Sequence, residues 1–330
     1  MKRESWAKRQ KIVAAVRTFF TERDFLEVET PALSVHRDVT PHILDFQTDY
    51  IHDGGKKTNL GMITSPEHYM KRLLADGWGN IFQICKFFRN GEVSRQHNPE
   101  FTGLEWYQTG ATYNDCMNLT EELVRYAGQA LNVKSAIYNG IRCDISNRFE
   151  RLTVRDAFLR YTGMDLNELQ SKEVMIQACL KMGQKPMADE PWDDMFFRIF
   201  LSAVEPKLGI ERPVFLHDYP PSMAALSIIS EHDGRWSAER FELYICGVEL
   251  CNGFSELRDP VEQRARFKRQ IEEKNKIHGG EYTIDEEFIE ALGRMPQAAG
   301  NAMGLDRLTM ILLDLKDISE AIPFPLFSSM

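Results

Sequence analysis

Residues 87–107 read FFRNGEVSRQHNPEFTGLEWY, and the rest of the chain is organised around this stretch. Its apolar and aromatic residues are typical of two strands, at 80–88 and 101–110, joined by a polar loop. Because side chains alternate along a strand, Phe101, Glu105 and Tyr107 share one face of the second strand. The loop carries groups that can hold a polyphosphate or stack on a flat base, namely Arg89, Arg95, His97 and Asn98. The alternative is an exposed, charged hairpin loop without a ligand.

The composition of the chain bounds its class. A length of 330 residues, 43% of them hydrophobic, predicts one large domain or two small ones with a packed core. A net charge of −9 argues against broad binding to a phosphate backbone, which needs a basic face. The six cysteines form no CxxC pair, which favours reduced, buried thiols over disulfides or a zinc site. The N-terminus lacks an apolar signal core and no run of 18 apolar residues occurs, so we expect a cytoplasmic protein without a membrane span.

The N-terminal third contains two helix signals. Apolar residues at helical spacing predict a helix over 5–22, followed by a strand that Pro31 ends. Residues 36–58 read as a loop or irregular hairpin, whose histidines have no ligand spacing. A strand at 60–64 then leads into a second helix, with Ser65 as N-cap, Pro66 at the first helical position and Glu67 in the first turn. These three residues can be interpreted in two ways. They either only cap the helix or also line a binding pocket.

The middle of the chain carries little recognisable chemistry. An amphipathic helix is expected over 114–131, opened by Asn114 or Asp115. Residues 150–208 contain helical segments with apolar residues three and four apart, which indicates a helical insertion. A strand at 213–219 follows.

Residues 240–257 read RFELYICGVELCNGFSEL and predict a β-hairpin. With a two-residue turn at 246–247, Tyr244 pairs with Glu249 and Glu242 pairs with Cys251. Glu242 and Glu249 then share a face, and their repulsion would be relieved by Mg²⁺, which binds carboxylate oxygens together with nucleotide phosphates. The alternative is that one of them faces solvent.

Two further segments complete the analysis. Glu256 is out of phase with Glu249 along the predicted strand, and a bulge at Gly253 would turn it into the same pocket. Residues 261–278 form a highly charged helix with a solvated face. At the C-terminal end, 300–308 read GNAMGLDRL and lead into an apolar helix.

Four of these segments resemble class II aminoacyl-tRNA synthetases. The FRN and HNPEFT of residues 87–107 resemble motif 2 of the lysyl branch, and GVELCNGFSEL resembles its GxExxNGFxEL segment. The helix and strand of 5–31 resemble motif 1, and GNAMGLDRL resembles motif 3. The resemblance covers almost all of the chain. It implies an α+β fold, with an antiparallel sheet flanked by helices, in a single catalytic domain over 1–330 that forms a homodimer through motif 1.

The resemblance also implies a reaction, in which ATP and Mg²⁺ activate an amino acid as an adenylate. Arg89 and Arg307 would be the catalytic cations, and Glu242 and Glu249 would hold the metal. The implied ATP-binding residues are Arg89, Asn90, Gly91, His97, Asn98, Phe101, Glu249, Leu250, Gly304 and Arg307. The implied residues of the amino-acid pocket are Ser65, Pro66, Glu67, Glu105, Tyr107, Asn252, Glu256 and Ala302, with Glu256 on the distal ammonium of a lysine. Gly91 stands where the motif has glutamate. At this position the backbone can still contact adenine, but no side chain is present to do so.

The expected helix of motif 1 starts at about residue 5, which leaves no room for an anticodon-binding domain. Together with the acidic charge, this makes tRNA an unexpected partner. The chain resembles the truncated lysyl-tRNA synthetase paralogues that attach (R)-β-lysine, or lysine, to a lysine side chain of elongation factor P. Two positions favour this group: Arg95 lies two places before His97, and Ala302 stands in place of glycine. The methyl group of Ala302 matters because one methyl in a pocket can shift the preference between isomers by ~1–3 kcal/mol.

Two alternatives remain open at this point. One is another class II adenylating enzyme, such as an amide-forming synthetase or a tRNA ligase with a separate anticodon module. The other is a catalytically inactive binding paralogue, against which the intact Arg89, Glu249, Glu256 and Arg307 argue.

Overall fold

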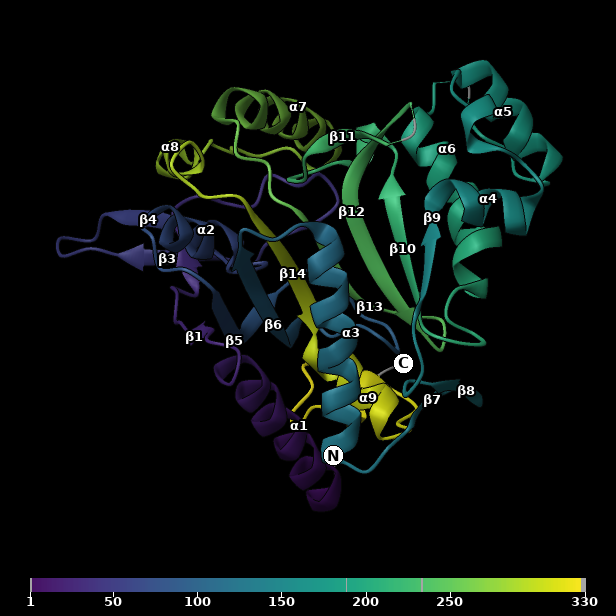
Figure 1. Cartoon of the computed structure of the whole chain (residues 1–330). Helices are drawn as coiled ribbons and strands as arrows, with labels where there is room; N and C mark the ends of the chain where they lie inside the picture. Colours follow the sequence, from purple (N-terminus) through teal and green to yellow (C-terminus); the bar gives the residue numbers. More distant parts are fainter. Residues whose placement is uncertain (1, 188, 233, 328–330) are drawn as a thin grey trace.

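The computed structural model describes residues 2–187, 189–232 and 234–327. Its centre is a nine-stranded sheet in the order β1-β5-β6-β14-β13-β12-β10-β9, with β11 paired to β12 (Figure 1). Pairing is antiparallel except between β1 and β5 and between β9 and β10, so the predicted α+β fold with an antiparallel sheet is confirmed in its main part. The strands are β1 Leu26–Glu27, β5 Ile81–Phe88, β6 Glu100–Thr109, β9 Glu150–Thr153, β10 Val214–Tyr219, β11 Ile229–His232, β12 Arg235–Ile245, β13 Val248–Ser255 and β14 Ala298–Gly304.

The two strands predicted around residues 87–107 form the hairpin β5–β6. Phe87 lies opposite Phe101, and β6 pairs on its other side with β14. Because β6 is enclosed between two strands, the alternation of its side chains fixes one face toward the core and the other toward the site. Trp106 is fully buried in the core, whereas Glu105 and Tyr107 face the opposite way.

Three helices cover the core face of the sheet (Figure 1): α1 Arg3–Thr21, α3 Tyr113–Ala130 and α9 Leu305–Leu312. The start of α3 differs from the prediction. It begins at Tyr113 because Thr112 is the N-cap, and the Asp115 carboxylate accepts the backbone N–H of Thr112 at 2.8 Å in a capping box. Asp115 therefore supports the cap, while Asn114 already lies inside the helix.

A buried ion pair joins two of these helices to the sheet. Arg9 of α1 donates to Asp306 Oδ1 at the start of α9, with 2.7 Å between Nη2 and the oxygen. Asp306 Oδ2 accepts the backbone N–H of Thr102 in β6 at 2.7 Å, and Arg9 also donates to Thr102 Oγ1. Motif 1, motif 2 and motif 3 are thus held in one network, which fixes their relative positions.

The segment 150–208 contains helices with a core of their own. They are α4 Val154–Thr162, α5 Lys172–Lys181, α6 Trp192–Ile199 and the short turns η1 Leu166–Glu168, η2 Phe200–Val204 and η3 Glu205–Lys207. Phe158 and Phe196 stack at 4.8 Å between ring centroids in this second core. These helices lie beside β9 and β10 at the edge of the sheet (Figure 1).

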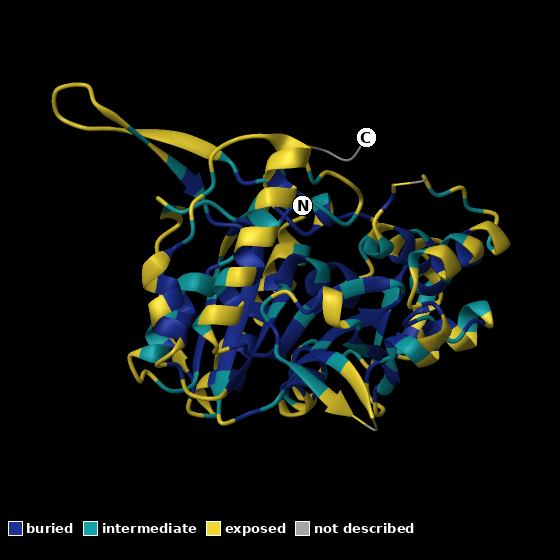
Figure 2. Ribbon diagram, turned by 90° about the horizontal axis from the view of Figure 1, so that it is seen from above, coloured by how far each residue is buried: buried dark blue, intermediate teal, exposed yellow. Residues whose placement is uncertain are grey.

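Most of the remaining elements lie around the open face of the sheet, whereas the small hairpin of residues 135–144 and the turn at 318–320 pack with α9 on the core side. The remaining elements are α2 Glu67–Ala75, α7 Pro260–His278, α8 Glu286–Leu292, the strands β2 Leu33–Ser34, β3 Gln47–Ile51 and β4 Lys57–Met62, the small hairpin β7 Ser135–Tyr138 with β8 Ile141–Asp144, and the turns η4 Pro221–Met223 and η5 Ile318–Glu320. The region 36–58 contains a regular strand, β3, whose hairpin with β4 projects from the body as an exposed arm (Figure 2). The strand predicted at 60–64 is β4 and ends two residues earlier.

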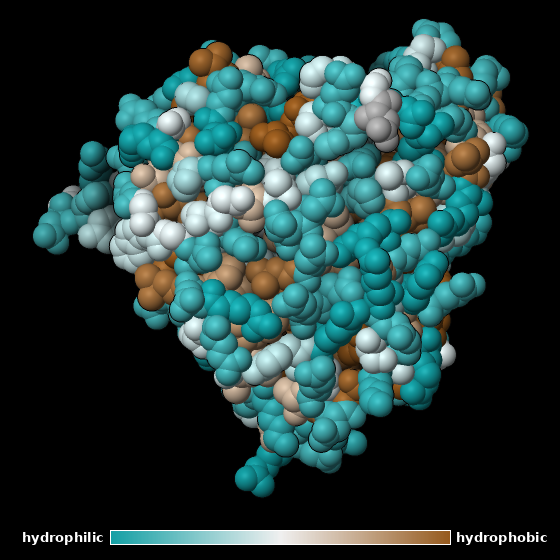
Figure 3. Space-filling model, viewed as in Figure 1, coloured by the Kyte–Doolittle hydropathy of each residue, from teal (hydrophilic) through white to brown (hydrophobic). Residues whose placement is uncertain are grey.

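The surface and the thiols are those of an ordinary globular chain. Figure 3 shows apolar side chains scattered among hydrophilic ones on the face viewed, without one broad apolar area. All six cysteines are free thiols, five of them buried. Within the part of the chain that the structure describes, the helices are too short or too polar to span a bilayer.

Candidate active site

A cavity of about 1130 Å³ opens on the face of the sheet opposite α1 and α3. Most of the predicted site residues line it: Ser65, Glu67, Arg89, His97, Asn98, Phe101, Glu105, Tyr107, Glu249, Leu250, Asn252, Glu256, Ala302, Gly304 and Arg307. They come from β6, β13, β14, the start of α2, the start of α9 and the loop after β5, so segments far apart in the sequence are brought together by the sheet order.

Four predicted residues do not line this cavity. Asn90 instead borders a separate groove of about 720 Å³ beside the β3–β4 arm, and its backbone N–H donates to Leu44 O. Gly91 lies in a turn with a φ of +82°. Pro66 is the N-cap of α2, one position before the predicted one, and Glu242 is covered by its own hydrogen-bond partners.

One end of the cavity carries the arginines. The Arg89 guanidinium lies over the Phe101 ring, 5.5 Å from its centroid, and its Nε has no hydrogen-bond partner among the described residues. Arg307 donates to the carbonyls of Gln96 and Glu249 at 3.1 and 2.9 Å. Both cations therefore sit where a phosphate chain could bind, but Arg307 is at present held by backbone oxygens that a phosphate would replace.

His97 is a neutral acceptor in this arrangement. Burial, together with the positive charges of Arg307 and Arg89, lowers the pKa of His97 to about 4. Its Nε2 lies 2.6 Å from Arg307 Nη2, which can only donate, so the ring proton resides on Nδ1 and is donated to Ser94 Oγ at 2.7 Å. His97 thus orients Arg307 rather than adding a third positive charge.

The other end of the cavity is acidic. Glu67, Glu105 and Glu256 converge there, and Tyr107 Oη donates to Glu105 Oε1 at 2.6 Å. Burial and the neighbouring Glu67 raise the pKa of Glu105 to about 8. Burial also raises the pKa of Glu256 to about 8, against the opposing effect of Lys71. Glu105 Oε2 and Glu256 Oε1 have no hydrogen-bond partner among the described residues, so each can receive a donor from a ligand.

The hairpin β12–β13 differs in register from the prediction. Tyr244 pairs with Glu249, as predicted, but Glu242 pairs with Asn252 and not with Cys251. The reason is one additional residue on β13, which shifts the pairing between the two positions. Tyr244 Oη donates to Glu242 Oε2 at 2.7 Å, so Glu242 and Glu249 do lie on one face.

The additional residue is Leu250, and it explains the position of Glu256. A strand without it would place Glu249 and Glu256, seven residues apart, on opposite faces. The bulge restores the phase, so Asn252 and Glu256 join Glu249 in lining the cavity. The predicted bulge at Gly253 therefore lies three residues earlier.

The pair Glu242 and Glu249 fits a divalent cation in part. Burial and the charge of Glu242 raise the pKa of Glu249 to about 7, and a cation would relieve this repulsion. Glu242 already accepts hydrogen bonds from Tyr219, Tyr244 and Arg240. Across 2–187, 189–232 and 234–327 no group of three or more His, Cys, Asp or Glu could hold a metal, so nucleotide phosphates would have to supply further ligands.

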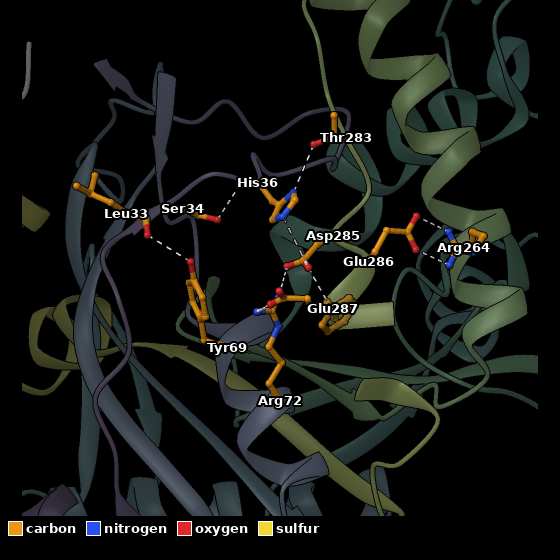
Figure 4. A network of polar contacts seen from close by, with 11 residues as sticks. Leu33, Ser34, His36, Tyr69, Arg72, Arg264, Thr283, Asp285, Glu286 and Glu287 are labelled. Carbon is orange, nitrogen blue, oxygen red and sulfur yellow. Dashed lines mark hydrogen bonds and ion pairs between the residues drawn. The ribbon is translucent and has the colours of Figure 1, made fainter. Parts of the chain in front are cut away.

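Helix α2 is fixed by contacts on its outer side (Figure 4). Arg72 pairs with Asp285 and also donates to Glu287 at 3.0 Å, while Tyr69 Oη donates to Leu33 O. His36 Nε2 lies 3.9 Å from Asp285 Oδ1, which connects the segment before β3 to the same network. These contacts hold the inner side of α2, with Glu67, toward the cavity.

Three residues of the site escaped the sequence analysis. Lys71, one turn after Glu67 on α2, reaches the acidic end, and its spacing of four was the available signal. A Cβ on Gly300 would lie 2.5 Å from Glu256 Oε1 and would also strike Tyr107, so only glycine leaves room for both side chains. Arg240 lines the cavity and donates to Asn252 Oδ1 at 2.8 Å.

Comparison with known proteins identifies the class. The model of the tRNA synthetases class II (D, K and N) matches residues 2–328. The chain therefore belongs to this family of class II synthetases.

Curated relatives narrow this class further. A Proteus mirabilis protein is 40% identical over 97% of this chain and 94% of its own length, and a Haemophilus influenzae protein is 41% identical over 96% and 93%. A Yersinia enterocolitica protein is 39% identical over 96% and 94%. All three are named elongation factor P--(R)-beta-lysine ligase. The chain belongs to the group of class II synthetases that these ligases represent, which confirms the resemblance found in the sequence.

Proposed function

We propose that this chain activates (R)-β-lysine, or lysine, with ATP and transfers it to a lysine side chain of elongation factor P. The observation that carries the proposal is the division of one cavity, with Arg89 and Arg307 at one end and three carboxylates at the other. A lysine isomer offers the matching charges, a carboxylate to be activated and two ammonium groups to be held.

The residues of the chain account for the activation step by position and charge. The amino acid's carboxylate attacks the α-phosphate of ATP, and pyrophosphate leaves as the adenylate forms. Arg89 is assigned to the α-phosphate and Arg307 to the γ-phosphate, where each offsets negative charge on the phosphate oxygens. When bound, Mg²⁺ would supply further neutralisation of the phosphates, held through Glu249 and influenced by Glu242.

The acidic end of the cavity supports the assignment of the amino acid. Glu256 is assigned to the distal ammonium, and Ser65, Glu67 and Glu105 to the amine nearer the reacting carboxyl. Ala302 lies directly opposite both Glu105 and Asn252 in the sheet, so its methyl borders the place where the two isomers differ. This position supports a role in isomer preference.

The test measures activation of the amino acid and its transfer to an acceptor in separate assays. ATP–pyrophosphate exchange should depend on (R)-β-lysine or lysine, and label should then pass to elongation factor P but not to tRNA. Transfer to tRNA would favour a tRNA ligase that uses a separate anticodon module. Exchange that no lysine isomer stimulates would refute the proposal and favour an inactive paralogue.

Assembly and location complete the proposal. A homodimer through α1 is supported by exposed apolar side chains there and on the following strands, among them Trp6, Leu26 and Leu33. Light scattering should give twice the chain mass of 38.1 kDa. The helices of 150–208 are taken as an insertion within the one catalytic domain, and the six free thiols support a reducing compartment, which we take to be the cytoplasm.

A further inference from the structure

Lys71 is a fully buried charged group at the acidic end of the cavity. Its side chain is 1% exposed, and its Nζ lies 2.5 Å from Glu67 Oε1 and 2.5 Å from Glu256 Oε2. The ring of Phe254 lies beneath it, with 5.1 Å from Nζ to the ring centroid. A buried ammonium is costly unless it is paired, and here two carboxylates from different elements pair with it.

The neighbouring charges identify what Lys71 balances. From its own helix it faces Glu67, with His68 behind it against the Phe288 ring. From the sheet it faces Glu256, with Glu105 and Tyr107 of β6 beyond. One cation therefore stands among three carboxylates, which leaves two of them uncompensated.

The position of Lys71 also separates two carboxylates that would otherwise interact. Its Nζ contacts one oxygen of Glu67 and one of Glu256, so it lies between them. Glu256 Oε1 is left without a partner among the described residues, as is Glu105 Oε2. Two acceptor oxygens thus remain for a ligand, and a lysine isomer has two ammonium groups.

We propose that Lys71 is a positioning residue that holds Glu67 and Glu256 apart and favours the ionised form of Glu256, so that a substrate with two amines meets two carboxylate acceptor oxygens in the pocket. This inference rests on the proposed function and deepens it. Lys71 is fixed from outside the pocket as well, because the next residue, Arg72, anchors α2 to Asp285 and Glu287 (Figure 4).

Removal of the Lys71 charge has a defined consequence. Two carboxyl groups that are close together without a cation share a proton, as like charges do at close range. The shared proton occupies the oxygens that receive the substrate's amine, so binding then requires displacing it. The resulting defect is largest near neutral pH and declines as pH rises, because both carboxyl groups ionise in alkaline solution.

The test compares Lys71→Met with wild type by ATP–pyrophosphate exchange between pH 7 and pH 9. The KM for the lysine isomer should rise about tenfold or more at pH 7, and the ratio of variant to wild-type KM should fall toward one at pH 9. The KM for ATP should change less than about twofold, since the arginine end is untouched. Because the ratio is taken at each pH, ionisation of the substrate's own amines cancels.

Two further variants separate charge from structure. Lys274→Met removes another buried ammonium, which donates to the carbonyls of Asp38 and Ile43 and does not line the cavity, so its KM ratio should not vary with pH. Lys71→Arg keeps the charge and should retain the wild-type pH profile even if its KM is raised, which provides the test if Lys71→Met does not fold.

The outcomes distinguish this inference from the proposed function. Suppose that wild type activates lysine. The positioning role is then refuted if the ratio of Lys71→Met to wild-type KM for the lysine isomer is near one, or if this ratio is raised but does not change with pH. A pH profile in Lys71→Arg displaced from wild type by a unit or more would equally refute the role of charge. If wild type activates no lysine isomer, it is the proposed function that fails.

Discussion

Replacement of Glu256 by glutamine tests the acidic end of the cavity most directly. The change keeps the shape of the side chain but removes its charge, and Glu256 is one of the two carboxylates that contact Lys71. Its free Oε1 is the proposed acceptor for the substrate's distal ammonium. A hydrogen bond to a charged group contributes about 1.5–3 kcal/mol, so we expect the KM for lysine to rise roughly 10- to 150-fold.

The size of this effect should depend on pH in a known direction. The pKa of Glu256 is raised to about 8 in the ligand-free protein, so at pH 7 Glu256 is protonated in most molecules. This proton must leave when the substrate's ammonium binds. The free energy of lysine binding to wild type is therefore less favourable by about 1.4 kcal/mol for each unit by which the pH lies below that pKa. The glutamine variant has no proton to lose, so its binding lacks this cost. The ratio of variant to wild-type KM should grow by up to about tenfold from pH 7 to pH 9.

The assay is ATP–pyrophosphate exchange, with lysine and ATP varied separately. The KM for ATP should stay close to wild type, because the arginines lie at the other end of the cavity. Glu121→Gln is a matched control, since Glu121 is also buried and paired, with Arg125, but lies on α3 away from the cavity. An unchanged KM for lysine in Glu256→Gln, at a melting temperature near that of wild type, would show that the distal ammonium binds elsewhere.

Three further predictions concern the rest of the site. Arg307→Ala should cost ~2–4 kcal/mol of transition-state stabilisation in pyrophosphate exchange, and near-normal exchange would remove the motif 3 assignment. Ala302→Gly should shift the kcat/KM preference between isomers toward α-lysine by about tenfold, measured in parallel with both isomers, because the methyl lies opposite Glu105; an unchanged ratio would place discrimination elsewhere. Glu249→Gln should raise the Mg²⁺ concentration for half-maximal exchange severalfold at saturating ATP, whereas an unaltered Mg²⁺ titration would exclude this carboxylate as a ligand.

Local patterns in the sequence predicted the parts of the structure that depend on neighbouring residues. The hairpin β5–β6 and the pairing of Tyr244 with Glu249 follow from alternation and a two-residue turn, and both are confirmed. Helix boundaries were less accurate. Thr112 was overlooked as the cap of α3 because Asn114 and Asp115 are also good capping residues, and only the backbone angle decides among them.

Local sequence patterns did not predict the contacts between segments that are distant in the sequence. The ion pair of Arg9 with Asp306 spans 297 positions, and on sequence spacing Arg9 is one of several charged residues on an amphipathic helix. Lys71 was missed for a related reason. Its spacing from Glu67 is that of an ordinary surface pair, and only the approach of Glu256 from the sheet makes it part of the site.

The bulge at Leu250 shows how the cost of burying polar groups selects one register over another. In a regular strand, alternation from Glu249 would place Cys251 and Gly253 in the cavity and turn Asn252 and Glu256 into the apolar core. Burying a carboxylate there without a partner costs several kcal/mol, more than the loss of regular pairing at one residue. With the bulge, Cys251 packs in the core and Glu256 meets Lys71. The additional residue is therefore required by the chemistry of Glu256, and the sequence signal for it is a glutamate out of phase with the strand that carries it.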